Sequence, residues 1–169
     1  EISGFETWSY FNRDTGFPMG YMLKDEKTFS VARYTSLIYL VSSRGFLGTT
    51  VLVSALSYIG MWKFYSLIVK LYPFAEKNAF YIIMCTPSLL FWGGGIMKDT
   101  YVLSASCWFC YNFYMCLIRR EKQLVNILLL VLNTIVILNI KSYVFLSLFP
   151  GALLWLNSAY LKQIKNSLV

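Results

Sequence analysis

The sequence predicts an all-α fold, a polytopic transmembrane bundle of about five membrane-spanning helices with one interfacial helix beside them. Of its 169 residues, 57% are hydrophobic and 14% are charged, and the mean hydropathy is +0.56, a balance far from that of a soluble domain. The charged residues also divide the chain into long uncharged intervals. Runs such as ILLLVLNTIVILNI are apolar on all sides, whereas the strands of a membrane barrel alternate apolar and polar residues. The spans are therefore expected to be helices.

The uncharged intervals set the expected positions of the five spans. Each interval holds 18 to 20 residues, close to the roughly 20 that a helix needs to cross a bilayer core of about 30 Å. Allowing for the residues that flank each interval, we expect spans over residues 46–70, 78–92, 96–118, 123–140 and 143–161. They make up a transmembrane domain over residues 31–169.

The N-terminal part differs in composition from the rest. Residues 1–30 form the one polar stretch, which we expect to be an extracytoplasmic (periplasmic) loop or lid. About ten uncharged residues then separate Arg33 from Arg44, too few for a crossing but enough for an interfacial helix. The chain begins with a glutamate and has no charged leader before an apolar core, so we expect a fragment of a longer protein.

The distribution of positive charge predicts the orientation. Basic residues gather at alternate turns, around KLYPFAEKN, in RREK at 119–122 and at the C-terminal end, while the other turns hold only GGGIMKD and IKSY. The positive-inside rule assigns the first set to the cytoplasm. Residues 1–30, Lys98, Asp99 and Lys141 then share the extracytoplasmic face. Because the basic residues follow topology rather than forming one polar patch, a nucleic-acid partner is not expected.

The cysteines do not suggest a metal or redox centre. Cys85, Cys107, Cys110 and Cys116 all fall in expected helices, and the chain has no histidine to complete a usual zinc or haem set. We therefore expect them to be small packing residues, and we predict no metal ligands. No cofactor is indicated, and a requirement for a divalent metal is left open.

The segment PSLLFWGGGIMKD is the strongest candidate for a binding site. A helix over 78–92 would reach only about 22 Å, and the three glycines Gly93, Gly94 and Gly95 cannot comfortably continue it. Irregular backbone near the membrane edge requires a cavity or a protected turn to satisfy its amides. The next helix is expected to start near Ile96, which places Lys98 in its first turn.

Helix N-termini attract anions, so the glycine amides and Lys98 are candidates to hold a phosphate, with Lys141 assisting. Three roles for Asp99 stay open: capping the helix, pairing with Lys98 or Lys141, or accepting a proton as a catalytic residue. A simpler interpretation stays open, in which the glycines form a tight turn, Lys98 snorkels and Lys141 anchors a helix end.

The order of these motifs resembles a known family. PSLLFWGGGIMKD, followed by a Tyr-rich helix ending in RREK and by NIKSYVFLSLFPGALLW, is similar to GT-C-type polytopic membrane glycosyltransferases and polysaccharide-assembly proteins of Gram-negative bacteria. The resemblance covers residues 28–155 and is most specific at the Pro87-Ser88, Phe91-Trp92, Gly95 and Lys98-Asp99 positions of the PSxxFWxSGxxKD pattern. Gly94 stands where that family has serine, and Ser142 stands where proline commonly follows the lysine.

The resemblance implies a glycosyltransferase that moves sugar from a polyprenyl-phosphate-linked donor to an acceptor on the periplasmic face of the bacterial inner membrane. Its catalytic base would be an acidic residue of the first extracytoplasmic loop, for which Glu1, Glu6 and Asp14 are the candidates. The expected partners are the lipid bilayer and the lipid-linked sugar.

Two other classes remain as alternatives. GT-C folds have more helices than the five expected here, so the chain is either part of an enzyme or a non-catalytic membrane subunit that packs with other subunits of a larger complex. The subunit alternative predicts that the Cys107/Cys110 face and the small residues Ser104 and Ala105 contact a partner helix. A transporter ranks last, because the uncharged intervals carry no ion pathway.

Overall fold

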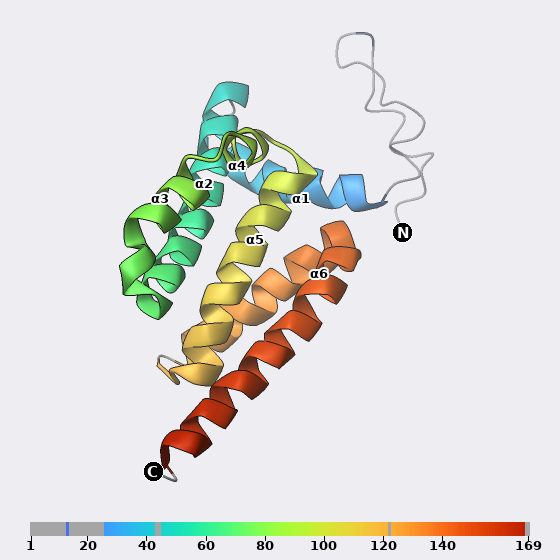
Figure 1. The fold of residues 1–169 in the computed structure, drawn as a ribbon. Helices are drawn as coiled ribbons and strands as arrows, with labels where there is room; N and C mark the ends of the chain where they lie inside the picture. The colour runs from blue at the N-terminus through green and yellow to red at the C-terminus, as the bar shows by residue number, and fades with distance from the viewer. Residues whose placement is uncertain (1–12, 14–25, 43–44, 122, 168–169) are drawn as a thin grey trace.

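The computed structural model describes residues 13, 26–42, 45–121 and 123–167, and this part of the chain is helical, without a strand (Figure 1). The element order is α1 (Glu26–Val41), α2 (Phe46–Leu71), a 3₁₀ turn (Pro73–Ala75), α3 (Glu76–Met84), α4 (Pro87–Gly93), α5 (Lys98–Phe113) with a π-helical extension (Tyr114–Ile118), and α6 (Gln123–Ser167). The prediction of an all-α fold is confirmed for the described residues.

Three helices are long and apolar enough to cross a membrane. They are α2, α5 with its π-helical extension, and α6 up to Ser158. In the most apolar 18-residue stretch of each helix, 50% of the residues of α5 are buried, compared with 28% in α2 and 22% in α6. Helix α5 is therefore the central helix of the bundle. Large apolar side chains cover the outside of the other two, as expected where helices face lipid; they include Leu47, Val51, Leu124, Leu128, Leu146 and Leu154.

The packing of α5 against α2 depends on small residues. A Cβ atom on Gly60 would lie 2.7 Å from Ser104 Oγ and 3.0 Å from Ser104 Cα, so only glycine allows this close approach. Ser104 Oγ donates a hydrogen bond to the Leu56 carbonyl at 3.3 Å. On the other side of α5, Ala105 packs with Ile137 of α6. The small residues expected to meet a partner helix therefore pack within this chain.

Helix α6 folds back on itself at Lys141, whose φ of −142° and ψ of 79° are not helical. Figure 1 shows its two arms running in opposite directions. Leu130 and Trp155, which lie at similar distances along the chain from Lys141, pack against the same core cluster. These arms correspond to the expected spans 123–140 and 143–161, and the first arm, at 18 residues, would measure about 27 Å.

The expected span over 78–92 is wrong as a single helix. Helix α3 ends at Met84, and α4 begins at Pro87 after a break at Cys85 and Thr86, so Cys85 does not lie inside a helix. The proline ring keeps the preceding Thr86 extended, at φ −68° and ψ 118°, and itself suits the first position of a new helix. With 9 and 7 residues, α3 and α4 measure only about 14 and 11 Å. A bundle of five full crossings thus stays a prediction.

Helix α1 lies across one end of the bundle (Figure 1), and its position at the membrane interface stays a prediction. It starts at Glu26, earlier than the predicted domain boundary at residue 31. Two polar contacts attach it to the bundle. The hydroxyls of Thr35 and Tyr101 lie 2.7 Å apart, and Asn139 Nδ2 donates to Tyr34 Oη at 3.1 Å. The end of the bundle that carries the start of α5 and the turn of α6 is therefore covered by α1.

Candidate functional site

The glycine segment forms a sharp connection between α4 and α5. Helix α4 ends at Gly93, residues 94–97 are bends, and α5 begins at Lys98 with Met97 in the N-cap position, so the expected break is confirmed. The Gly94 amide donates to the Phe91 carbonyl at 3.3 Å. A Cβ atom on Gly94 would lie 2.9 Å from the Leu90 carbonyl oxygen, so a larger residue here would force the backbone to shift.

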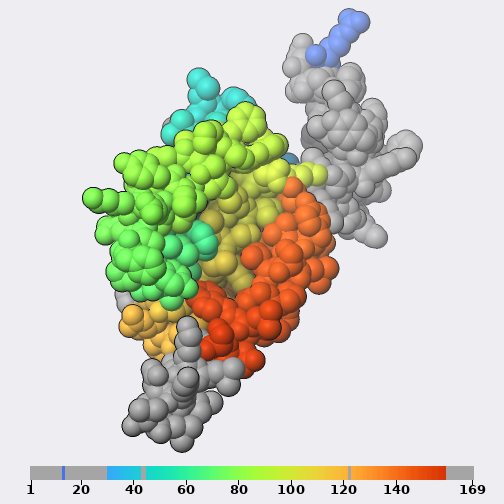
Figure 2. Space-filling view, in the orientation of Figure 1, coloured from blue at the N-terminus to red at the C-terminus, as the bar shows by residue number. Residues whose placement is uncertain are grey.

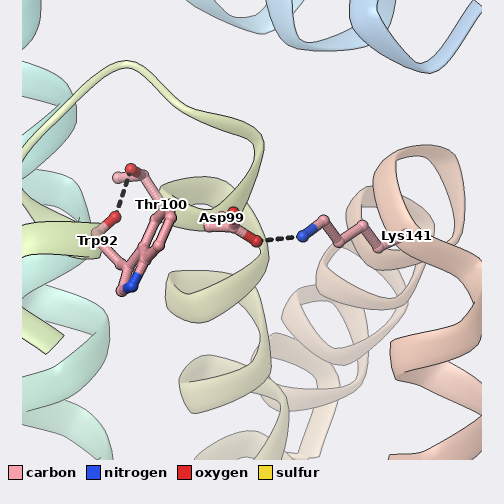
Figure 3. Close-up of polar contacts among 4 residues, drawn as sticks. All are labelled: Trp92, Asp99, Thr100 and Lys141. Carbon is pink, nitrogen blue, oxygen red and sulfur yellow. Dashed lines mark hydrogen bonds and ion pairs between the residues drawn. The ribbon is translucent and has the colours of Figure 1, made fainter. Parts of the chain in front are cut away.

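Thr100 fixes this loop on the first turn of α5. This residue is 1% exposed, and its hydroxyl lies 2.7 Å from the Trp92 carbonyl (Figure 3). The same hydroxyl lies 2.6 Å from the Gly95 carbonyl, so its one proton is shared between a carbonyl at the end of α4 and a carbonyl within the bend. Sequence reasoning missed Thr100, although its place directly after Lys98 and Asp99, within the first turn of a helix, was a usable signal.

Asp99 forms an ion pair with Lys141 (Figure 3). The pair joins the first turn of α5 to the turn of α6, and Lys141 Nζ also lies 6.0 Å from the centre of the Tyr143 ring. The side chains are 40% exposed for Asp99 and 22% exposed for Lys141, so the pair is only partly accessible. Among the alternatives for Asp99, the structure shows its pairing with Lys141. The carboxylate also lies near the positive end of the α5 dipole.

An apolar groove of about 310 Å³ meets the glycine loop from the side of α2. Gly93 and Gly94 form the end of the groove nearest the loop, and residues of α2 and Leu90 of α4 form its walls. A Cβ atom on Gly93 would lie 3.3 Å from Ser57 Oγ of α2, so glycine keeps α4 close to that helix. The α2 residues that line the groove are Ser54, Ala55, Tyr58 and Met61.

We define the glycine corner as Gly93, Gly94, Gly95, Lys98, Asp99, Thr100 and Lys141. It includes every predicted phosphate-binding residue and Asp99, one of the three predicted catalytic residues, and its contacts join Asp99 to Lys141 and Thr100 to Gly95. Glu6 and Asp14 lie outside the described residues. Lys98 lies half-buried at the start of α5, and no side chain caps the amides of that first turn.

The described residues hold no group of three or more His, Cys, Asp or Glu side chains that could hold a metal ion. All four cysteines are free thiols, with Cys107 and Cys116 buried among apolar side chains. Gly93 and Gly94 line the apolar groove and lead, through residues 95–97, to the N-terminus of α5 at Lys98. An apolar groove followed along the chain by a helix N-terminus and a lysine suits an anion attached to a hydrocarbon chain.

A comparison with protein-family models, curated proteins and solved structures finds no match for this chain.

Proposed function

We propose that this chain is the membrane-embedded part of a GT-C-like glycosyltransferase or polymerase that uses a polyprenyl-phosphate-linked sugar. In this proposal it lies in the inner membrane of a bacterium and acts on the periplasmic face in polysaccharide synthesis. The chain crosses the membrane five times, with α3 and α4 together forming one broken crossing and the two arms of α6 forming two more.

One observation carries the proposal: the apolar groove between α2 and α4 reaches Gly93 and Gly94, at the start of the short loop that leads to the N-terminus of α5 at Lys98. A polyprenyl phosphate has the same two parts, an apolar chain and an anionic end. We assign the groove to the first isoprene units and the glycine amides with Lys98 to the phosphate, because helix N-termini and lysines both bind phosphate.

The other polar residues receive supporting roles. Lys141 neutralises Asp99, so that the carboxylate does not repel the donor phosphate from the same corner. Asp99 is then a positioning residue, since its pairing with Lys141 orders the start of α5. Glu6 and Asp14, in the N-terminal segment, are our candidates for the base that deprotonates the acceptor hydroxyl.

A second candidate function is supported by one feature of the surface. Figure 2 shows a hollow between α3 and α4 on one side and the second arm of α6 on the other, with α5 at its floor. A cavity of about 190 Å³ lies between α5 and this arm, and Gly151 lines it. A helix from another subunit could pack there, which would make the chain a non-catalytic member of a larger membrane complex.

Binding of undecaprenyl phosphate to the chain in lipid nanodiscs tests the first proposal. Ala55→Trp fills the exposed groove without entering the core, and Lys98→Ala removes the proposed phosphate contact. We expect each change to weaken binding by about tenfold or more, which corresponds to about 1.4 kcal/mol. Leu128→Trp, on an exposed apolar face of α6, is the matched control and should bind as the unchanged chain does.

Two results would contradict the proposal. One is equal binding of undecaprenol, which lacks the phosphate, because the anion would then contribute nothing. The other is unchanged binding by Ala55→Trp and Lys98→Ala, both correctly inserted, because neither the groove nor the corner would then hold the lipid. Copurification of a second membrane protein that covers the α5–α6 cavity would favour the subunit alternative.

A further inference from the structure

The C-terminal half of α2 carries two lysines on one face of the helix. Lys63 and Lys70 are seven residues apart, which places them on the same side of the helix about 10 Å apart along its axis. Lys63 stands eight residues before the end of α2, so it lies within a helix long and apolar enough to cross a membrane. Ionisable residues at such positions are costly and commonly functional.

Both lysines contact aromatic rings of α5. Lys63 Nζ lies 5.6 Å from the centre of the Trp108 ring and 5.2 Å from that of Tyr111. Lys70 Nζ lies 5.6 Å from the same Tyr111 ring and 3.9 Å from Met115 Sδ. Two ammonium groups therefore share one ring, within the distance at which a ring face attracts a cation. We name Lys63, Lys70 and Tyr111 the lysine–tyrosine cluster.

No carboxylate in the described part of the chain pairs with either lysine of this cluster. Asp99, which does form an ion pair, is at the other end of the bundle with Lys141. The neighbouring turn is held by the Glu121 amide, which donates to the Met115 carbonyl at 3.1 Å, and it carries Arg119 and Arg120 together with the Glu121 carboxylate. Within the described residues, the two lysines therefore form a positive site that has ring contacts and no ion pair.

We propose that the lysine–tyrosine cluster binds the phosphate headgroup of an anionic phospholipid, such as phosphatidylglycerol or cardiolipin. Lys70 is exposed and Lys63 is half-buried, so a phosphate can approach both from the outer surface of α2. Trp62, 46% exposed, and the apolar surface of α2 beside it offer a place for the acyl chains.

The direction of the chain in the membrane agrees with this ligand. The positive-inside rule assigns this end to the cytoplasm, where anionic lipids attract clustered lysines and arginines. The site shares no residue with the glycine corner and does not depend on the function proposed for it: its lysines lie in the C-terminal half of α2 and contact the C-terminal half of α5, whereas the glycine corner lies at the N-terminus of α5.

Native mass spectrometry of the full chain in detergent, with added phosphatidylglycerol or phosphatidylcholine, tests the proposal. We expect the unchanged chain to prefer phosphatidylglycerol, and Lys63→Met with Lys70→Gln to lower its affinity for that lipid about tenfold or more. Lys70→Gln alone, at an exposed position, should lower it about threefold and leave the fold intact. Lys77→Gln is the matched control, because it removes an exposed lysine from α3 at the same end.

The outcomes separate the sources of phosphate. Retained binding of phosphatidylglycerol in excess inorganic phosphate supports a lipid site. Displacement by inorganic phosphate at equal concentration would overturn it in favour of a site for free phosphate. Equal losses for Lys77→Gln and Lys70→Gln would also overturn it, because general surface charge would then explain the binding. Lys63→Arg keeps the charge and the ring contact, so it should bind nearly as the unchanged chain does.

Discussion

The two ends of the bundle hold their lysines in different ways. At the glycine corner, Lys141 pairs with the Asp99 carboxylate, and the loop beside them is attached to α5 through the Thr100 hydroxyl. In the lysine–tyrosine cluster, Lys63 and Lys70 face a ring and have no carboxylate partner among the described residues. The first arrangement is ordered by polar contacts, whereas the second leaves positive charge to be neutralised from outside. Comparable variants at the two ends should therefore differ in their effects on stability.

Asp99→Asn should have the largest effect on stability. It leaves Lys141, which is 22% exposed, without its anionic partner. We expect a loss of about 2 kcal/mol in the free energy of unfolding. This value lies between the losses typical of disrupting a solvent-exposed ion pair and those typical of disrupting a buried one. Unfolding in mixed micelles measures it. Glu76→Gln, a first-turn carboxylate on α3, is the control, and a similar loss there would mean that the helix dipole rather than Lys141 is responsible.

Thr100→Val should rank second, at about 1 to 2 kcal/mol. The substitution keeps the shape of the side chain but removes the hydroxyl that serves the Trp92 and Gly95 carbonyls. Thr134→Val is matched to it, because the Thr134 hydroxyl bonds only within its own helix, to the Leu130 carbonyl. If both variants unfold with equal ease, Thr100 does not hold the glycine loop in place.

Tyr111→Leu should cost about 1 kcal/mol, because two cation–ring contacts of roughly 0.5 kcal/mol each are lost. Tyr111→Phe keeps the ring and should unfold as the unchanged chain does. The same micelle assay compares them. A large loss for the phenylalanine variant would show that the hydroxyl, rather than the ring face, matters at this position.

Lys63→Met should have the smallest effect, within about 0.5 kcal/mol of zero. Removing a charge that has no carboxylate partner relieves its desolvation, which offsets the lost ring contacts. A loss as large as that of Asp99→Asn would erase the difference between the two ends and would point to an anionic partner for Lys63 within the chain.

The helices with uniform apolar sequence were predictable. Helix α2 was expected over 46–70 and runs from Phe46 to Leu71, and the glycines end α4 as expected. The pairing of Asp99 with Lys141 was among the stated alternatives, because the orientation rule put both residues on one face. These features follow from local composition and from the order of charges along the chain.

Features that depend on which helix faces meet were not predictable. A proline disfavours helical geometry in the residue before it, yet the expected span over 78–92 was continuous, and the break at Cys85 and Thr86 needed the fold to accommodate it. The contact of Lys63 with Trp108 joins residues of two helices, and neither helix alone shows which side faces the other.

The most direct test of the account is photo-crosslinking of the chain in nanodiscs with a polyprenyl phosphate that carries a diazirine near its phosphate, followed by peptide mapping. We expect labels on Tyr58 and Leu90, which line the groove beside the glycine corner, and their loss in Ala55→Trp. Labels confined to the opposite end, on Trp108 and Tyr111, would contradict the account, because the donor lipid would then occupy the lysine–tyrosine cluster.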